Sequence, residues 1–192
     1  ADVVKAGKVR AVVLATHNVT ALASGDTITV THPSASAKAL GAYEFAGLAQ
    51  SGTLLDRTST NANSGTAVDS LATAPITQAN ELLIGLAGIN GPIDDTFTPN
   101  LAQNWTALPR SGSAGGGASS NATINPLYRV VNTILSYRTQ GTNSANRDWG
   151  AIIATYQIAF RASSCARAVV RARSRTAVRA RGRVALAIDT LP

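Results

Sequence analysis

The sequence predicts an all-β protein, a two-sheet antiparallel β-sandwich of jelly-roll-like type followed by a C-terminal arginine-rich β arm. Three observations indicate this fold class. Roughly eight apolar or alternating segments are separated by turn-forming residues, as in sandwiches and jelly rolls. None of these segments repeats with the period of an amphipathic helix. Eight arginines fall within the last thirty-two positions, which hold one acidic residue.

The N-terminal part is expected to hold three strands. Residues 8–15 (KVRAVVLA) are apolar and β-branched, and residues 27–31 (TITVT) alternate between Thr and Ile or Val, both of which favour strands. Turn-forming residues at 23–26 (ASGD) predict that the chain reverses between these two strands. Residues 37–45 (AKALGAYEF) follow as a third strand. The face that we expect to be apolar in this strand consists of Ala37, Ala39, Gly41, Tyr43 and Phe45.

The middle of the chain alternates between polar loops and buried strand. Residues 51–79 are rich in Ser, Thr, Asn and Gly, which predicts loops with one or two short strands. Residues 81–89 (ELLIGLAGI) are almost continuously apolar and contain two glycines, which favours a strand covered on both faces over a helix. Residues 91–100 and 112–120 are expected to be a loop and a flexible linker.

Three further strands are predicted at residues 127–131, 134–139 and 151–160. In the last of them, apolar residues alternate from Ile152 onward. This alternation places Tyr156 and Phe160 in the core, and Trp149, just before the strand, as a plug at the core or at its edge.

Five short blocks carry a resemblance to a known family. They are residues 24–30 (SGDTITV), 43–48 (YEFAGL), 80–85 (NELLIG), 128–131 (YRVV) and 149–151 (WGA). Over about residues 8–160, the chain resembles a family of prokaryotic and phage β-sandwich domains that occur in secreted proteins and virion appendages. The resemblance implies the sandwich fold and no shared active site. The segment beyond residue 161 lies outside it.

The charge distribution predicts two domains, a β-sandwich at 1–160 and a basic β arm at 161–192. In the arm, arginines occupy odd positions and aliphatic residues occupy even ones, the pattern of a strand with one cationic and one apolar face. A single strand over 167–188 would span roughly 70 Å, so it must turn near 174–176 or Gly182, or leave its own domain. We expect it to pair with other subunits. The residues assigned to this assembly arm are Arg167, Val170, Arg171, Arg173, Arg175, Val178, Arg179, Arg181, Arg183, Val184, Leu186 and Ile188.

Residues able to carry chemistry are few. His17 and His32 lack the spacing of a zinc site, and no GxSxG nucleophile elbow occurs, so neither an enzyme nor a cofactor is expected. The paired Asp94 and Asp95 are the candidate ligands for a hard cation such as calcium, against the alternative of a solvated loop tip. Trp105 is the candidate for contact with a glycan, against the alternative of a packed indole.

The expected function is that of a non-enzymatic structural subunit of a virion or extracellular assembly, whose partners are copies of itself or other structural subunits. Two alternatives stay open, a glycan-binding module and a capsid-like protein whose arginines contact nucleic acid. The chain has no apolar stretch that is long enough to span a membrane. It contains no methionine and begins Ala1-Asp2, so we expect a processed chain or a fragment. The lone Cys165 excludes an internal disulfide and is expected to be buried or at an interface.

Overall fold

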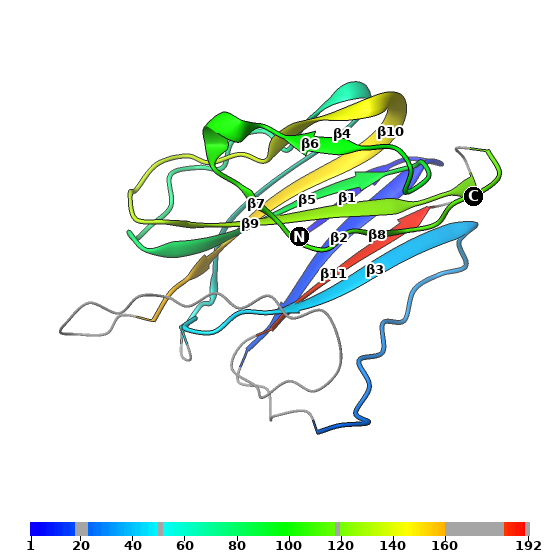
Figure 1. Ribbon diagram of the computed structural model, residues 1–192. Coiled ribbons are helices and arrows are strands. Elements are labelled where there is room, and N and C mark those ends of the chain that lie inside the picture. The colour runs from blue at the N-terminus through cyan, green and yellow to red at the C-terminus, as the bar shows by residue number, and fades with distance from the viewer. Residues whose placement is uncertain (18–22, 50–51, 118–119, 160–182, 191–192) are drawn as a thin grey trace.

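The computed structural model is an all-β structure whose sheets are antiparallel throughout, as the sequence predicts (Figure 1). It describes residues 1–17, 23–49, 52–117, 120–159 and 183–190, the last of these as backbone only. One short 3₁₀ helix, η1 (Leu101–Gln103), is the helical element of these residues.

The smaller of the two sheets is built from both ends of the chain. It contains β1 (Asp2–Lys5), β2 (Val9–Thr16), β3 (Ala37–Glu44) and β11 (Arg183–Thr190), in the order β1-β2-β11-β3. Since β11 is antiparallel to both β2 and β3, these two strands run parallel to each other with β11 between them (Figure 1).

The larger sheet is formed by the middle of the chain. Its strand order is β4 (Leu55–Asp69), β10 (Gln140–Gln157), β5 (Glu81–Ile89), β9 (Thr123–Val131) and β7 (Thr106–Ala107). The short strands β6 (Phe97–Pro99) and β8 (Ser111–Gly112) pair with β10 and β9 respectively.

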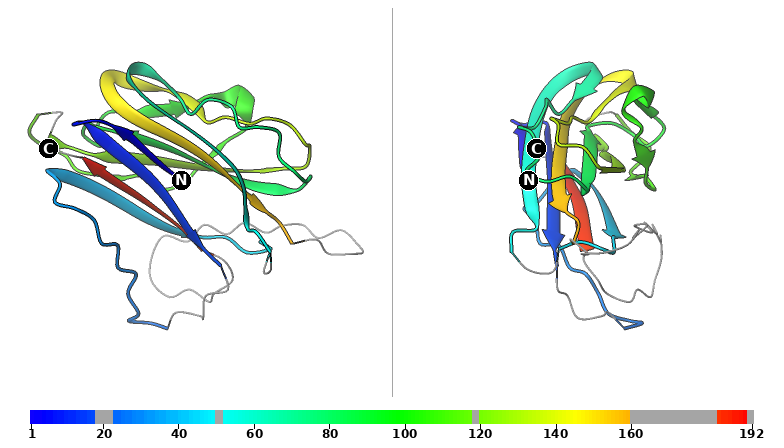
Figure 2. Two further views of the ribbon diagram at one scale, coloured as in Figure 1. Left: turned by 180° about the vertical axis from the view of Figure 1, so that it is seen from behind. Right: turned by 90° about the vertical axis from the view of Figure 1, so that its left-hand side faces the viewer.

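One hydrophobic cluster joins the two sheets. Val9, Ala11 and Val13 of β2 lie in the same cluster as Ile84 of β5 and Ile152 of β10. The backbones approach closely at Gly150, where an added Cβ would lie 3.0 Å from Val3 Cγ1. The two sheets therefore form two packed layers, and the left view of Figure 2 shows the smaller one in front.

The outer face of the larger sheet is covered as well. Trp149, Ala87 and Ile89 pack with Val68 and Phe97 in one cluster. A second cluster joins Leu83 and Ile153 to residues outside the strands, namely Ile76, Tyr137 and Trp105. Because core lies on both sides of it, β5 is buried at every one of its positions, as its continuous apolar sequence predicts.

The strand predicted at residues 27–31 is wrong. These residues form no strand, and Ile28 is 49% exposed. The reason is topological: a hairpin would place this segment beside β2, but both neighbours of β2 are taken by β1 and β11. Because β2 and β3 run in the same direction, the chain between them must return along the sheet, and residues 27–31 belong to this return.

The prediction of loops with one or two short strands at residues 51–79 is wrong in the length of the strand, since β4 is a single strand of 15 residues, Leu55–Asp69. The strand is polar because it is an edge strand, paired with β10 alone, and much of it faces solvent. Conversely, residues 134–139 are not a strand. They run beside 70–76, with Thr73 N donating to Tyr137 O at 2.8 Å and Ile76 N donating to Leu135 O at 3.1 Å.

Several predicted strands are confirmed, although their limits shift. Strands β2, β3 and β5 lie where the sequence places them, whereas β9 and β10 begin before the predicted 127 and 151. Tyr156 is 2% exposed, which confirms its place in the core, and Trp149 is buried to the same degree. Phe160 lies outside the described residues.

Candidate functional site

The C-terminal strand is the part of the predicted assembly arm that the structure describes. Arg183, Val184, Leu186 and Ile188 fall within β11. This strand pairs within its own chain, so the final segment of the arm belongs to the smaller sheet. The remaining arm residues lie outside the described residues, and their roles stay predictions: Arg167, Val170, Arg171, Arg173, Arg175, Val178, Arg179 and Arg181.

The backbone of β11 is paired along both of its edges. On one side the register runs from Arg183 opposite Thr16 to Asp189 opposite Arg10 in β2. On the other side it runs from Arg183 opposite Glu44 to Thr190 opposite Ala37 in β3. We call the space between β2 and β3 that β11 occupies the strand slot.

The walls of the strand slot have two distinct faces. Ala11, Val13 and Ala39 are buried on the side of the core, whereas Leu14 and Leu40 are 47% and 44% exposed on the outer side. Opposite the buried residues, the register places positions 186 and 188 of β11, which the sequence fills with Leu and Ile. The alternation that defined the arm thus matches the alternation of the slot.

A pocket of about 290 Å³ lies over the outer side of the slot. Its walls come from Val12 and Leu14 of β2, Leu40 of β3 and residues 30–33 of the return segment. Because β11 runs between β2 and β3, the pocket lies over the C-terminal strand.

Cationic residues border this pocket. Arg10 and Lys38 both belong to its lining, and the guanidinium of Arg10 forms an ion pair with Asp2 at 2.6 Å. The register places Asp189 of β11 directly between Arg10 and Lys38. Opposite charges on directly paired positions stabilise a sheet, so this alternation of charges favours the observed register.

His32 also lines the pocket, and its Nδ1 lies 2.6 Å from Pro33 O.

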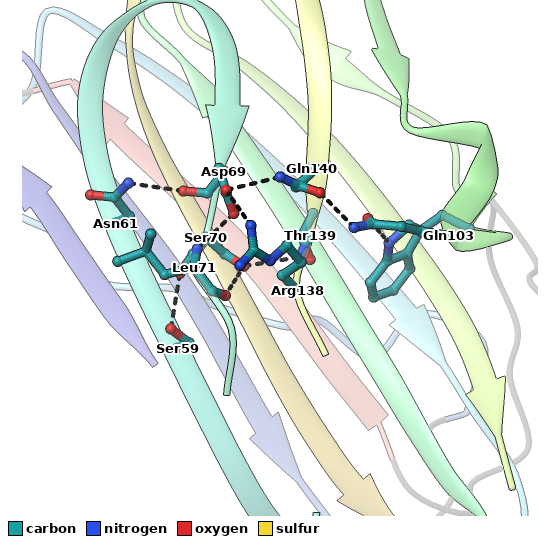
Figure 3. A network of polar contacts seen from close by, with 10 residues as sticks. Ser59, Asn61, Asp69, Ser70, Leu71, Gln103, Arg138, Thr139 and Gln140 are labelled. Atoms are coloured by element: carbon teal, nitrogen blue, oxygen red, sulfur yellow. Dashed lines mark hydrogen bonds and ion pairs between the residues drawn. The ribbon is translucent and has the colours of Figure 1, made fainter. Parts of the chain in front are cut away.

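Trp105, the candidate glycan contact, is half-buried against the cluster of Leu83 and Ile153. Its indole Nε1 donates a hydrogen bond of 3.0 Å to Gln103 Oε1, and Gln103 in turn donates to Gln140 at 2.7 Å (Figure 3). With its polar atom bound and its ring packed, Trp105 has the geometry of a structural residue. Glycan contact through its exposed part stays a prediction.

The same network continues to Asp69 at the end of β4 (Figure 3). Its carboxylate accepts hydrogen bonds from Arg138 at 3.0 Å, Gln140 at 2.9 Å and the backbone N–H of Leu71 at 2.8 Å. Leu71 has a φ of 63°, an uncommon left-handed conformation for a bulky residue. Asp69 therefore stabilises a tight turn that connects β4 to the outer layer.

The two candidate metal ligands lie in different surroundings. Asp95 forms an ion pair with Arg147 at 2.6 Å, and Arg110 donates to its backbone carbonyl at 2.6 Å. Asp94 is exposed. Within the described parts of the chain, no three His, Cys, Asp or Glu side chains lie close enough together to hold a metal ion.

Sequence reasoning missed Glu81, the first residue of β5. Its side chain is fully buried, and neither carboxylate oxygen meets a donor at hydrogen-bonding geometry. Its pKa is raised to about 7, chiefly by burial; nearby Asp56 contributes to the rise, and Thr155 and Arg57 oppose it. Asp56 accepts hydrogen bonds from Thr77 N and Oγ1, both at 2.7 Å. In the sequence, Glu81 is a single charged residue at the start of the apolar run at residues 81–89, and this position is the signal that could have identified it.

Comparisons with known proteins give no relative from which a function could be carried over. No family model, no curated protein and no solved structure matches this chain. Among the described residues there is no helix with the length and apolar character needed to cross a membrane.

Proposed function

We propose that the protein is a non-enzymatic structural subunit of a virion or extracellular assembly. Its body is a jelly-roll-like β-sandwich, and its C-terminal segment links copies of the chain. The observation that carries the proposal is the position of β11, which fills the strand slot and pairs on both edges.

The charge distribution supports this role. Residues 1–160 contain equal numbers of basic and acidic residues, so the net charge of +7 arises in the C-terminal segment. Arginine is the cation best suited to ion pairs at interfaces, because its planar guanidinium binds carboxylates in a bidentate manner. A neutral body with a cationic segment next to its last strand fits a subunit that contacts its neighbours through that segment.

Exposed apolar side chains in the outer layer of the larger sheet also favour contact with protein. Leu71, Leu101, Ile134 and Leu135 are each at least half exposed, and Leu101 reaches 83%. They come from the segments that cover this sheet. Single exposed apolar residues are ordinary, but several in one layer are typical of an interaction surface.

The ion pairs described above support a structural role for this layer. Asp95 is bound to Arg147, and Asp69 is bound to Arg138. These pairs hold loops to strands. The resemblance to prokaryotic and phage sandwich domains supports a location on a virion or at an extracellular surface.

The mass of the purified full-length chain tests the proposal. Analytical ultracentrifugation over a range of concentrations should show a species of several copies. Ala187→Pro should reduce this species, because proline removes a ladder hydrogen bond from a central strand. Thr29→Pro, in the return segment outside the strands, is the matched control and should assemble like the wild type. A wild-type chain that stays monomeric at every concentration would overturn the proposal.

A further inference from the structure

The strand slot is made by two strands that cannot close on each other. Strands β2 and β3 are parallel and lie on opposite sides of β11, so about two strand spacings, roughly 9–10 Å, separate them. Without β11, the facing edges of both strands would expose unpaired N–H and C=O groups. Such edges bind an added strand through main-chain hydrogen bonds.

The slot selects its strand by pattern and by charge. The buried side of the slot requires apolar residues at alternate positions, and the sequence supplies Val184, Leu186 and Ile188 there. In the register, position 189, an aspartate, is paired with Arg10 in β2 and with Lys38 in β3. A shift by one residue would exchange the two faces and lose both matches. The strand that fits best is therefore the C-terminal strand of this chain, whichever copy supplies it.

The connection to β11 is long enough to serve either copy. Strand β10 ends at Gln157 and β11 begins at Arg183, so 25 residues lie between them. A chain of that length can span up to about 80 Å. Because β11 is covalently linked to the slot of its own chain, its effective concentration there is on the order of millimolar, which favours it over the strand of another copy. In an assembly whose neighbouring subunits lie within this reach, their strands would be present at comparable local concentrations.

We propose that β11 of one copy inserts into the strand slot of a second copy, in the register that it has within its own chain. This inference rests on the proposed function and identifies the contact that links the subunits. Each copy then both donates and accepts a strand. Reciprocal exchange closes a dimer, whereas head-to-tail exchange generates rings or open filaments.

Engineered disulfides distinguish exchange from pairing within the chain. In a Cys165→Ser background, Leu14→Cys and Ala185→Cys would be made as separate full-length variants, since Leu14 and Ala185 are direct register partners. Paired strand positions lie about 4.5–5.5 Å apart between Cα atoms, which suits a disulfide. The two variants would be unfolded together, refolded as a mixture and oxidised.

Exchange predicts a crosslinked species of twice the chain mass that contains the bond between positions 14 and 185. A mixture of Ala185→Cys with Thr66→Cys, on the exposed edge strand β4, should give no such species. The chain carrying both Leu14→Cys and Ala185→Cys reports whether the bond can form at all.

The two proposals fail in different ways. If the doubly substituted chain forms its bond only internally and the mixture gives none, while the wild type still assembles, strand exchange is wrong and the structural role stands. A wild type that is monomeric at every concentration contradicts both proposals.

Discussion

At the scale of single residues, Glu81 couples the stability of the larger sheet to pH. The groups that influence its pKa are Asp56 and Arg57 of β4 and Thr155 of β10, and Tyr137 in the outer layer is electrostatically coupled to it. Burial favours the neutral acid and outweighs Thr155 and Arg57, which lower the pKa. The folded protein therefore holds this proton up to about pH 7, whereas the unfolded chain releases it near its ordinary pKa of 4.5.

Glu81→Gln is expected to remove a loss of stability between pH 4.5 and pH 7. Because the folded pKa is raised, the contribution of Glu81 to stability is complete below pH 4.5 and is lost as the pH rises through 7, by up to about 3 kcal/mol. Urea unfolding across this range should show the decline in the wild type and not in Glu81→Gln. Asp94→Asn, at an exposed loop position, is the control and should keep the decline. An unchanged pH profile in Glu81→Gln would contradict this account.

Gly85 marks a close approach of the outer layer to the larger sheet. A Cβ at this position would lie 2.5 Å from Thr139 Oγ1 and 2.9 Å from its Cγ2, so Gly85→Ala must displace residue 139. We expect Gly85→Ala to destabilise the protein by about 1–3 kcal/mol, as measured by thermal or urea unfolding. Gly117→Ala, where an added Cβ meets nothing within 4 Å, should change stability by less than about 0.5 kcal/mol. Equal effects of the two substitutions would show that Thr139 of the outer layer does not pack closely against Gly85 of β5.

At the scale of elements, the position of a strand in its sheet predicts how well its backbone is protected. Strand β5 is paired on both edges and buried at every position, whereas β4 is paired with β10 alone. Amide hydrogen exchange measured by NMR should therefore be slow along all of β5. In β4, amides directed toward β10 should exchange slowly and those between them quickly. Uniform protection along β4 would indicate that another strand covers its edge.

The strands that could be predicted from the sequence are those that bury one or both faces with apolar residues. Apolar runs identified β2 and β5, and alternation identified β3. The polar strand β4 was missed because an edge strand does not need apolar side chains. Residues 27–31 have the alternation of a strand, but β11, from the far end of the chain, holds the place beside β2. A local pattern does not reveal a competitor that is distant in sequence.

The candidate site could be predicted only in part. The alternation of the C-terminal segment indicated a strand at Val184, Leu186 and Ile188, and β11 lies there. Its partner strands could not be derived, because pairing depends on the whole topology. Asp95 has the residue type of a cation ligand, but Arg147 binds its carboxylate, and sequence spacing gives no sign of such a partner.

At the scale of the whole molecule, the two ends of the chain meet in one sheet, while the middle forms the other. The larger sheet and the two clusters on its outer face come from residues 55–157, whereas the cluster between the sheets also contains Val9, Ala11 and Val13 of β2. The smaller sheet instead depends on contacts between the first and last parts of the chain. On the proposed linkage through β11, a change in the C-terminal segment should alter assembly while the larger sheet persists.

The order in which the strands are made gives the strand slot a consequence during synthesis. Strands β2 and β3 leave the ribosome well before β11, because 138 residues lie between the end of β3 at Glu44 and the start of β11 at Arg183. At translation rates of about 5–20 residues per second, the delay is on the order of ten seconds. Contacts of such long sequence separation also form slowly. Throughout this interval a nascent chain has an open slot, and on a polysome the nearest β11 already made can belong to the chain ahead of it.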